Sequence, residues 1–302
     1  MTEPSPTAAT VVPLHPAARA PAQTERALAK VNLYLHLRGL REDGYHLLES
    51  LVVFPGLGDV LEVEDGPGLG LTLDGPFAWD LPADGDNLVL QAAERLAAAA
   101  GIARPRAALR LQKNLPVASG IGGGSADAAA ALRLLSRSWG VEVPEALALA
   151  LGADVPVCLA CAPRLMEGIG ERLSPAPALP PLWIVLVNPL VQVETRAVFR
   201  ETTEKEGAAM APPPPDGFAD PGSALAWLAT GRNDLEPAAR RLCPPVARVL
   251  DALSDAPLAR MSGSGATCFA LYPEREAAMA KAAELRDGEP GWWTAAAPVM
   301  AA

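Results

Sequence analysis

Lysine is scarce in this sequence of 302 residues. Lysine and arginine together number 25, yet only four of them are lysines, Lys30, Lys113, Lys205 and Lys281. Where arginine is the usual basic residue, a lysine is consistent with a place that needs a compact ammonium group, and chance placement is the alternative. The acidic residues number 35, and the net charge of −10 argues against a nucleic-acid-binding surface. An anionic ligand would therefore need positive charge supplied locally.

Cysteine is also sparse, with Cys158, Cys161, Cys243 and Cys268 as the full set. The first two form a C-x-x-C pattern, but no second pair has the spacing of zinc ligands. Their neighbours are apolar, so we expect buried free thiols in a reducing cytoplasm. No apolar run reaches about eighteen residues, so no membrane-spanning helix is expected. The first 24 residues lack the features of a secretory signal and are predicted to form a flexible extension.

Glycine, in contrast, is concentrated in one place. Gly120, Gly122, Gly123 and Gly124 are followed by Ser-Ala-Asp and then by an alanine- and leucine-rich run. Glycines let a ligand approach backbone N–H groups closely, and the run after them favours a helix over about 126–139. We expect Ser125 or Asp127 to cap that helix. A helix N-terminus behind a glycine loop is typical of a phosphate-binding site.

Spacing excludes the two commonest phosphate-binding loops. A P-loop requires Gly-Lys-Ser/Thr, but no lysine lies between Asn114 and Ala131. A dinucleotide-binding loop requires G-x-G-x-x-G, but the sixth position counted from Gly120 is Ser125. A tight turn without a ligand remains an alternative, although such turns rarely need so many glycines.

Apolar patterning predicts an α+β protein, because strands and helices are mixed without strict alternation. Pro/Gly-rich residues 207–222 are predicted to form a loop. Strands are expected over 27–37, 45–53, 59–64, 69–73, 107–112, 182–187 and 267–271. Helices are expected over 87–100, 126–139, 144–151, 195–202, 223–229, 244–253 and 274–286.

Further segments repeat a family pattern in order along the chain. Residues 29–33 read Ala-Lys-Val-Asn-Leu, residues 43–46 read Asp-Gly-Tyr-His, and residues 261–266 read Met-Ser-Gly-Ser-Gly-Ala. With the glycine loop between them, they resemble the GHMP kinase superfamily, which uses a glycine-rich loop in place of a P-loop. Within it, the kinases of 4-diphosphocytidyl-2-C-methyl-D-erythritol are the most similar. Their motifs match residues 29–33, 43–46, 86–88, 122–129, 152–156, 167–171 and 233–236.

This resemblance implies a two-domain GHMP-kinase fold of the α+β class. Its N-terminal half would be ribosomal-protein-S5-domain-2-like, over 25–173, and its C-terminal half ferredoxin-like, over 174–302. The active site would lie in the cleft between the halves. The resemblance also implies an ATP-dependent kinase that phosphorylates the 2-hydroxyl of the methylerythritol group, in the non-mevalonate route to isoprenoid precursors.

The same resemblance assigns residues to ATP. Asn87, Leu88 and Lys113 match the part of the family that surrounds the adenosine, and Ser125 would offer a hydroxyl to Mg²⁺. The ATP phosphates would be held by the backbone of the loop. That loop consists of Pro116, Val117, Ala118, Ser119, Gly120, Ile121, Gly122, Gly123, Gly124, Ser125 and Ala126.

Catalytic and substrate roles follow by the same comparison. Asp154 matches the catalytic base, and Lys30 matches the lysine beside it, which balances charge at the transferred group. Both also have ordinary alternatives, a turn aspartate and a surface lysine. Asn32 would touch the substrate, while Tyr45, His46 and Phe199 match the segments that hold the cytosine. Ordinary core packing is the alternative for Tyr45 and Phe199.

The expected partners are thus two small molecules, ATP and the cytidyl diphosphate-linked methylerythritol. No nucleic acid, membrane or obligate protein partner is expected. One alternative is another GHMP enzyme, such as a homoserine, mevalonate or sugar kinase, although the Asp-Gly-Tyr-His segment suits a cytidine pocket better. The other alternative is a catalytically silent nucleotide-binding protein on the same scaffold.

Overall fold

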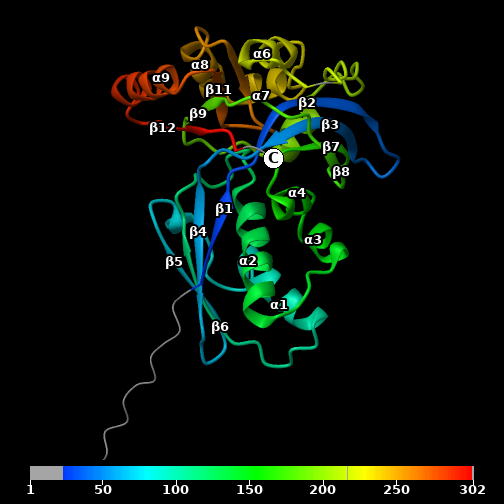
Figure 1. The fold of residues 1–302 in the computed structure, drawn as a ribbon, viewed down its shortest axis with the longest axis vertical. Coiled ribbons are helices and arrows are strands. Elements are labelled where there is room, and N and C mark those ends of the chain that lie inside the picture. Colours follow the sequence, from blue (N-terminus) through cyan, green and yellow to red (C-terminus); the bar gives the residue numbers. More distant parts are fainter. Residues whose placement is uncertain (1–22, 216, 301–302) are drawn as a thin grey trace, which may run out of the picture.

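The computed structural model describes residues 23–215 and 217–300 of the chain (Figure 1). Its strands are β1 (Gln23–Leu28), β2 (Val31–Leu40), β3 (His46–Val53), β4 (Gly58–Glu64), β5 (Leu69–Asp74), β6 (Ala107–Gln112), β7 (Arg164–Gly168), β8 (Arg172–Pro175), β9 (Trp183–Asn188), β10 (Leu258–Met261), β11 (Cys268–Tyr272) and β12 (Trp293–Pro298). The helices are η1 (Ala78–Asp80), α1 (Leu88–Ala99), α2 (Gly123–Trp139), α3 (Glu145–Leu151), α4 (Val155–Ala160), α5 (Thr195–Glu201), α6 (Pro221–Ala229), α7 (Glu236–Leu242), α8 (Pro244–Ala252) and α9 (Arg275–Gly288).

The N-terminal half contains a mixed sheet with the strand order β1-β4-β6-β5. Helix α2 packs against β1 and β4, and α1 packs against α2 and β5, so the two helices cover one face of this sheet (Figure 1). The residues Ala128 to Ala131 of α2 are all fully buried. Small side chains around the whole helix let it lie close to the sheet and to its neighbouring helices. The glycine loop precedes this buried helix and is held in place by it.

A second sheet is ordered β2-β3-β7-β8, and most of its edge strand β2 is buried. Every residue of β2 from Val31 to Leu37 is buried. A strand buried on both faces lies between two layers, and here one of these layers belongs to the C-terminal half. Leu33 and Leu51 share a core with Ile184 and Phe269 of β9 and β11.

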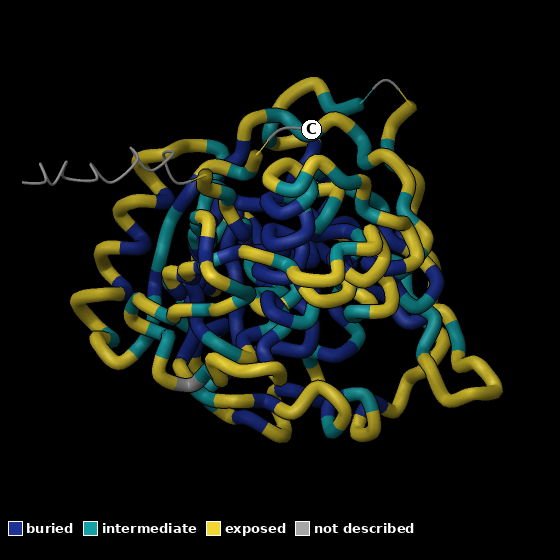
Figure 2. Tube along the Cα trace, turned by 90° about the horizontal axis from the view of Figure 1, so that it is seen from below, coloured by how far each residue is buried: buried dark blue, intermediate teal, exposed yellow. Residues whose placement is uncertain are grey.

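The C-terminal half is built on an antiparallel sheet ordered β10-β11-β9-β12. In chain order these strands occupy positions 2-3-1-4, and helices connect β9 to β10 and β11 to β12, which is the ferredoxin-like arrangement. The predicted two-domain α+β fold is confirmed. The domain boundary stays a prediction, because positions 173 and 174 fall inside β8. Figure 2 shows the buried residues gathered at the centre of the molecule.

Several elements differ from the expected ones. The strand predicted over 27–37 is divided into β1 and β2, and α4, α7, β7, β8, β10 and β12 were not predicted. Gln23 and Thr24, placed in the flexible extension, belong to β1, where they pair with Val63 and Glu62 of β4. The rest of that extension lies outside the described residues. Among the helices described, none is long and apolar enough to cross a membrane.

Candidate active site

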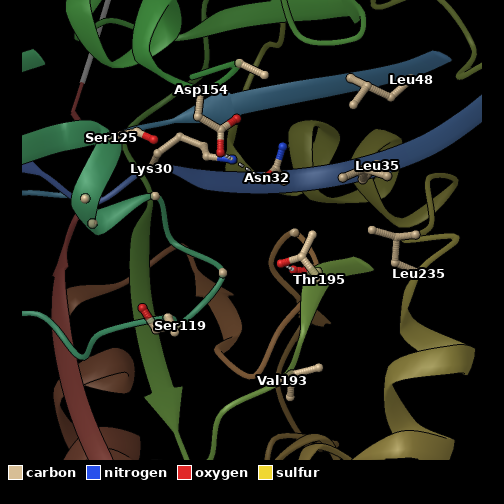
Figure 3. A pocket seen from close by; sticks show the side chains of 18 of the residues that line it. Lys30, Asn32, Leu35, Leu48, Ser119, Ser125, Asp154, Val193, Thr195 and Leu235 are labelled. Atoms are coloured by element: carbon tan, nitrogen blue, oxygen red, sulfur yellow. Dashed lines mark hydrogen bonds and ion pairs between the residues drawn. The ribbon is translucent and has the colours of Figure 1, made fainter. Parts of the chain in front are cut away.

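A cavity of about 470 Å³ lies between the two halves (Figure 3). From the N-terminal half it is lined by Lys30, Asn32, Leu35, Leu48, Leu88, Ala118, Ser119, Gly120, Gly122, Gly123, Gly124, Ser125, Ala153, Asp154, Met166 and Ile169. From the C-terminal half it is lined by Val193, Thr195, Phe199, Leu235, Gly263 and Ser264. The cavity therefore joins the glycine loop to Lys30, Asp154 and Phe199, in the cleft that the fold was predicted to have.

Helix α2 starts inside the glycine cluster. Gly122 is the N-cap, with a left-handed φ of 66° and no side-chain cap, so the expected cap by Ser125 or Asp127 is wrong. A Cβ atom at Gly122 would lie 3.2 Å from the Cβ and Cε atoms of Lys30, a tight contact that adds to the strain of a side chain at this left-handed φ. The first N–H groups of the helix have no acceptor within it, and Gly123 and Gly124 expose them to the cavity. This end of α2 is suited to an anion.

The glycine loop is locked against a second loop from the C-terminal half. A Cβ atom at Gly120 would lie 2.5 Å from the Gly265 oxygen and 2.8 Å from the Ser262 oxygen. The Ser262 hydroxyl donates to the Gly120 carbonyl at 3.2 Å, and the Thr267 amide donates to the Ser119 carbonyl at 3.1 Å. The segment 262–267 therefore fixes one side of the glycine loop.

Lys30 and Asp154 meet on the wall of this cavity (Figure 3). Lys30 Nζ lies 3.0 Å from Asp154 Oδ2 and donates to Asn32 Oδ1 at 3.0 Å. The Lys30 side chain is nearly buried, whereas that of Asp154 remains 36% exposed toward the cavity. Among the described residues that line the cavity, Lys30 is the only basic one. A carboxylate accessible to a ligand, held beside a buried ammonium, can orient a hydroxyl and accept its proton.

Two local features bring these residues together. Lys30 lies in the break between β1 and β2, and its backbone N–H donates to the Ile121 carbonyl at 2.9 Å. Asp154 stands at the N-cap position of α4, with Pro156 inside the first turn of that helix. Proline is favoured there because its missing N–H is not needed. The start of α4 thus presents Asp154 across the glycine loop from Lys30.

Asn32 lines the cavity but also holds Lys30 in place. Its Oδ1 accepts from Lys30, and its Nδ2 donates to the Ser50 hydroxyl at 2.7 Å. Ser50 is fully buried on β3 and donates in turn to the Tyr34 carbonyl at 2.6 Å. Because Asn32 is fixed from both ends, it sets the direction of the lysine ammonium. Its contact with the substrate stays a prediction.

The residues expected at the cytosine are only partly brought together. His46 packs against Phe199 with ring centroids 5.0 Å apart and the rings tilted by 32°, and Phe199 lines the cavity whereas His46 does not. Burial, followed by the charge of Lys205, lowers the pKa of His46, so this ring is neutral near pH 7. Tyr45 is 60% exposed beside them and does not line the cavity.

Six residues assigned to ATP do not line the cavity: Asn87, Lys113, Pro116, Val117, Ile121 and Ala126. Asn87 caps α1 by accepting from the Val89 N–H at 2.9 Å, so it shapes the region where Leu88 reaches the cavity. Ile121 and Ala126 are buried in the cores. Lys113 is buried beneath the loop between two carboxylates, and its place near the adenosine stays a prediction.

The sequence did not predict part of the cavity wall that the C-terminal half forms. Thr195, at the start of α5, and Ser264 place their hydroxyl oxygens 2.8 Å apart at the cavity. Ser264 lies in a segment that the sequence did single out, near the phosphate loop. Thr195 carries no motif, and only the distance to Ser264 reveals it.

Comparisons with known proteins agree with this geometry. The model of the GHMP kinases N terminal domain matches residues 87–161, and that of the GHMP kinases C terminal domain matches residues 218–289. The 4-diphosphocytidyl-2-C-methyl-D-erythritol kinase of Paramagnetospirillum magneticum is 54% identical over 285 residues, covering 91% of this chain and 97% of that protein. The chain belongs to the 4-diphosphocytidyl-2-C-methyl-D-erythritol kinase family. The resemblance predicted from seven motifs, and the class of small-molecule kinase, are confirmed.

Solved structures agree with membership of the 4-diphosphocytidyl-2-C-methyl-D-erythritol kinase family. A crystal structure of 4-(cytidine 5'-diphospho)-2C-methyl-D-erythritol kinase matches with a TM-score of 0.72 and 34% identity, covering 92% of this chain and 99% of that one. Homoserine kinase from Cytophaga hutchinsonii matches with a TM-score of 0.66 at 19% identity, over 96% of this chain and 98% of that one. The second match shows the shared fold alone.

Proposed function

We propose that this chain transfers the γ-phosphoryl group of ATP to the 2-hydroxyl of 4-diphosphocytidyl-2-C-methyl-D-erythritol. The observation that carries the proposal is the contact between Lys30 and Asp154 in a cavity that also contains the start of α2. Phosphoryl transfer depends mainly on positioning and on neutralising charge, and this arrangement supplies both. The kinase family to which the chain belongs supports the same reaction.

In this mechanism Asp154 accepts a hydrogen bond from the acceptor hydroxyl and takes its proton as the new P–O bond forms. The ammonium of Lys30 lies beside that carboxylate and offsets negative charge on the transferred group. Asn32 keeps the ammonium in place through Ser50. The departing ADP carries away the electron pair of the broken P–O bond.

The residues of the glycine loop fit the phosphates of a nucleoside triphosphate. The glycines at 122 to 124 leave their backbone exposed, and the first turn of α2 directs N–H groups at the cavity. In the described part of the chain, no three His, Cys, Asp or Glu side chains form a metal cluster. Mg²⁺ commonly binds through few protein ligands together with substrate phosphates, and Ser125 and Asp154 are oxygen-bearing side chains that line the cavity. The ion would supply further charge neutralisation.

The cytidyl end of the substrate fits the part of the cavity near Phe199. An aromatic face stacks on a base, and a neutral imidazole offers one donor and one acceptor to its edge. His46 and Phe199 supply these two features side by side. Tyr45 lies in the exposed turn between β2 and β3, next to His46, and is assigned to the same base as part of this proposal.

The test is an ADP-release assay with the purified chain, ATP and Mg²⁺. We expect turnover with the cytidyl substrate and none with mevalonate or homoserine, and phosphorus NMR of the product should place the new phosphate on the 2-hydroxyl. Turnover with another alcohol instead would identify a different GHMP kinase. Binding of ATP without any turnover would favour the silent nucleotide-binding alternative.

The location of the enzyme belongs to the same proposal. Cys158, Cys161, Cys243 and Cys268 are all unpaired in the described structure, and burial raises the pKa of each thiol. Unreactive, unpaired thiols suit a reducing compartment, and we assign the chain to the cytoplasm.

A further inference from the structure

Beneath the glycine loop lies a buried ion cluster, formed by Asp59, Lys113 and Asp127. Lys113 Nζ donates to Asp59 Oδ2 at 2.5 Å and to Asp127 Oδ2 at 2.6 Å. All three side chains are almost completely buried, with exposed fractions of 4% or less. Burying three ionisable groups together costs free energy unless well-aligned ion pairs and hydrogen bonds offset it, so their arrangement is tightly determined.

The cluster connects both ends of the glycine loop. Asp59, on β4, also accepts the backbone N–H groups of Asn114 and Leu115 at 2.5 and 2.8 Å, just before the loop begins. Asp127 is on the second turn of α2, just after the loop. The ammonium of Lys113 bridges them, and so it fixes the position of the helix start relative to the strand that enters the loop.

The ammonium also lies directly under the first residue of α2. A Cβ atom at Gly123 would be 3.2 Å from Lys113 Nζ. Burial alone would lower the pKa of Lys113, but Asp127 and Asp59 outweigh it and hold this pKa above its ordinary value. Burial raises the pKa of Asp127, against the attraction of Lys113. The lysine is therefore charged, and its ammonium lies against the start of α2.

We propose that Lys113 acts as a positioning residue, which sets the affinity for ATP from beneath the glycine loop without touching the nucleotide. This inference rests on the proposed function only in that the loop binds the ATP phosphates. The N–H groups of Gly123 and Gly124 must lie within hydrogen-bond distance of those phosphates, and hydrogen bonds weaken steeply when their geometry is lost. A helix start that moves when the ammonium is removed would therefore weaken nucleotide binding.

The first test is Lys113→Met, with binding of ATP in the presence of Mg²⁺ measured by calorimetry. We expect the dissociation constant to rise at least about tenfold, while kcat at saturating ATP stays within about threefold, because Lys30 and Asp154 are untouched. Wild-type affinity for ATP in a folded Lys113→Met variant would overturn the proposal.

Lys281 offers a matched control. It is another buried lysine, with its Nζ 2.9 Å from Asp255 and 3.1 Å from Glu284, but it lies on α9 in the C-terminal half. Lys281→Met also removes a lysine from between two carboxylates. It is expected to change the dissociation constant for ATP by less than about twofold. An equal loss of ATP affinity in both variants would mean that the effect is one of general stability, and it would reject the proposal.

If Lys113→Met does not fold, Asp127→Asn tests whether the buried ion cluster sets the affinity for ATP. This substitution keeps the size of the side chain and an oxygen that accepts from Lys113, but it removes the charge that holds α2 to the ammonium. The dissociation constant for ATP should rise about threefold or more, and an unchanged value would overturn the proposal. A wild-type chain that binds ATP but does not phosphorylate the cytidyl substrate would reject the proposed function and leave this inference standing.

Discussion

Lys30 Nζ lies 3.0 Å from Asp154 Oδ2, although one residue precedes the glycine loop and the other follows it. The loop passes between the two parts of the chain that carry these residues, and Gly122 is in contact range of the lysine side chain. Phosphate binding and proton transfer are therefore assigned to groups that share one small region of the cavity.

Separate replacement of these two residues should stop the chemistry without removing the nucleotide. Asp154→Asn and Lys30→Ala should each lower kcat by about a thousandfold, because each loses a group that acts on the reacting atoms. The dissociation constant for ATP, measured by calorimetry, should stay within about threefold. Asp65→Asn, at an exposed pair with Arg106, serves as a control with wild-type turnover. Near wild-type turnover in Asp154→Asn or Lys30→Ala would remove its assigned role.

Ser50 should matter for catalysis although it does not line the cavity. Ser50→Ala removes the acceptor for Asn32 Nδ2, so Asn32 no longer holds the Lys30 ammonium in one direction. We expect kcat to fall about tenfold with little change in KM for ATP. The control is Ser136→Ala, which removes a hydrogen bond to the Val141 carbonyl at the far end of α2. Equal kinetic effects of the two variants would contradict the positioning role.

Phe199 should distinguish the cytidyl substrate from ATP. Phe199→Ala removes the ring that packs against His46 and lines the cavity, and base stacking is worth about 1–3 kcal/mol. Steady-state kinetics should show KM for the cytidyl substrate raised about tenfold and KM for ATP unchanged. Phe218→Ala, which loses a comparable contact with Trp227, is the control. A parallel rise of both KM values would exclude stacking on the cytosine.

Tyr45 gives a separate test of the same region. Because its ring is exposed and outside the cavity wall, Tyr45→Ala should raise KM for the cytidyl substrate less than Phe199→Ala does. KM for ATP should not change. Unchanged kinetics with both substrates would show that Tyr45 does not contribute to binding the cytosine.

His36 should make stability depend on pH. It is 1% exposed, and its Nε2 accepts from the Arg232 backbone N–H at 3.1 Å. Burial, followed by Arg232 and opposed by Asp234, lowers its pKa from 6.5 to about 4, and Arg260 and Arg38 add to the lowering. The unfolded chain therefore binds a proton at a higher pH than the folded chain does. This contribution to stability is present above pH 6.5 and is lost as the pH falls toward 4.

Urea denaturation at pH 7 and pH 5 measures this effect. The wild type should lose about 1–2 kcal/mol more than His36→Gln over this interval, because glutamine keeps an acceptor but does not titrate. Equal losses in the two proteins would show that His36 does not contribute.

The sequence was informative where a function depends on adjacent residues. The glycine loop, the Lys30 segment and the Asp154 segment each carry a local motif, and their order was enough to predict the family and the fold. The strand β6 was predicted with its observed bounds, because Ala107–Gln112 alternates cleanly and ends at polar residues.

Other features depend on contacts that no local pattern reveals. Glycine disfavours helices, so the sequence placed the start of α2 after the cluster, whereas Gly123 and Gly124 are helical. A Cβ atom at these positions would lie 3.2 Å from Lys113 Nζ and 3.3 Å from Leu88, so packing, rather than propensity, selects glycine. The burial of Lys113 escaped the sequence for a similar reason, since its partner Asp59 comes from a distant strand.

The close approach of Gly120 to the Ser262–Gly265 loop has a consequence for how members of this family can recombine. The backbones of the two halves meet here with no space for a side chain on Gly120. A chimera that takes its halves from different relatives must therefore bring together two loops that were never fitted to each other. A single crossover anywhere between residue 120 and residue 262 separates the two loops, so we expect tolerated chimeras to be those that take residue 120 and residues 262–265 from the same parent.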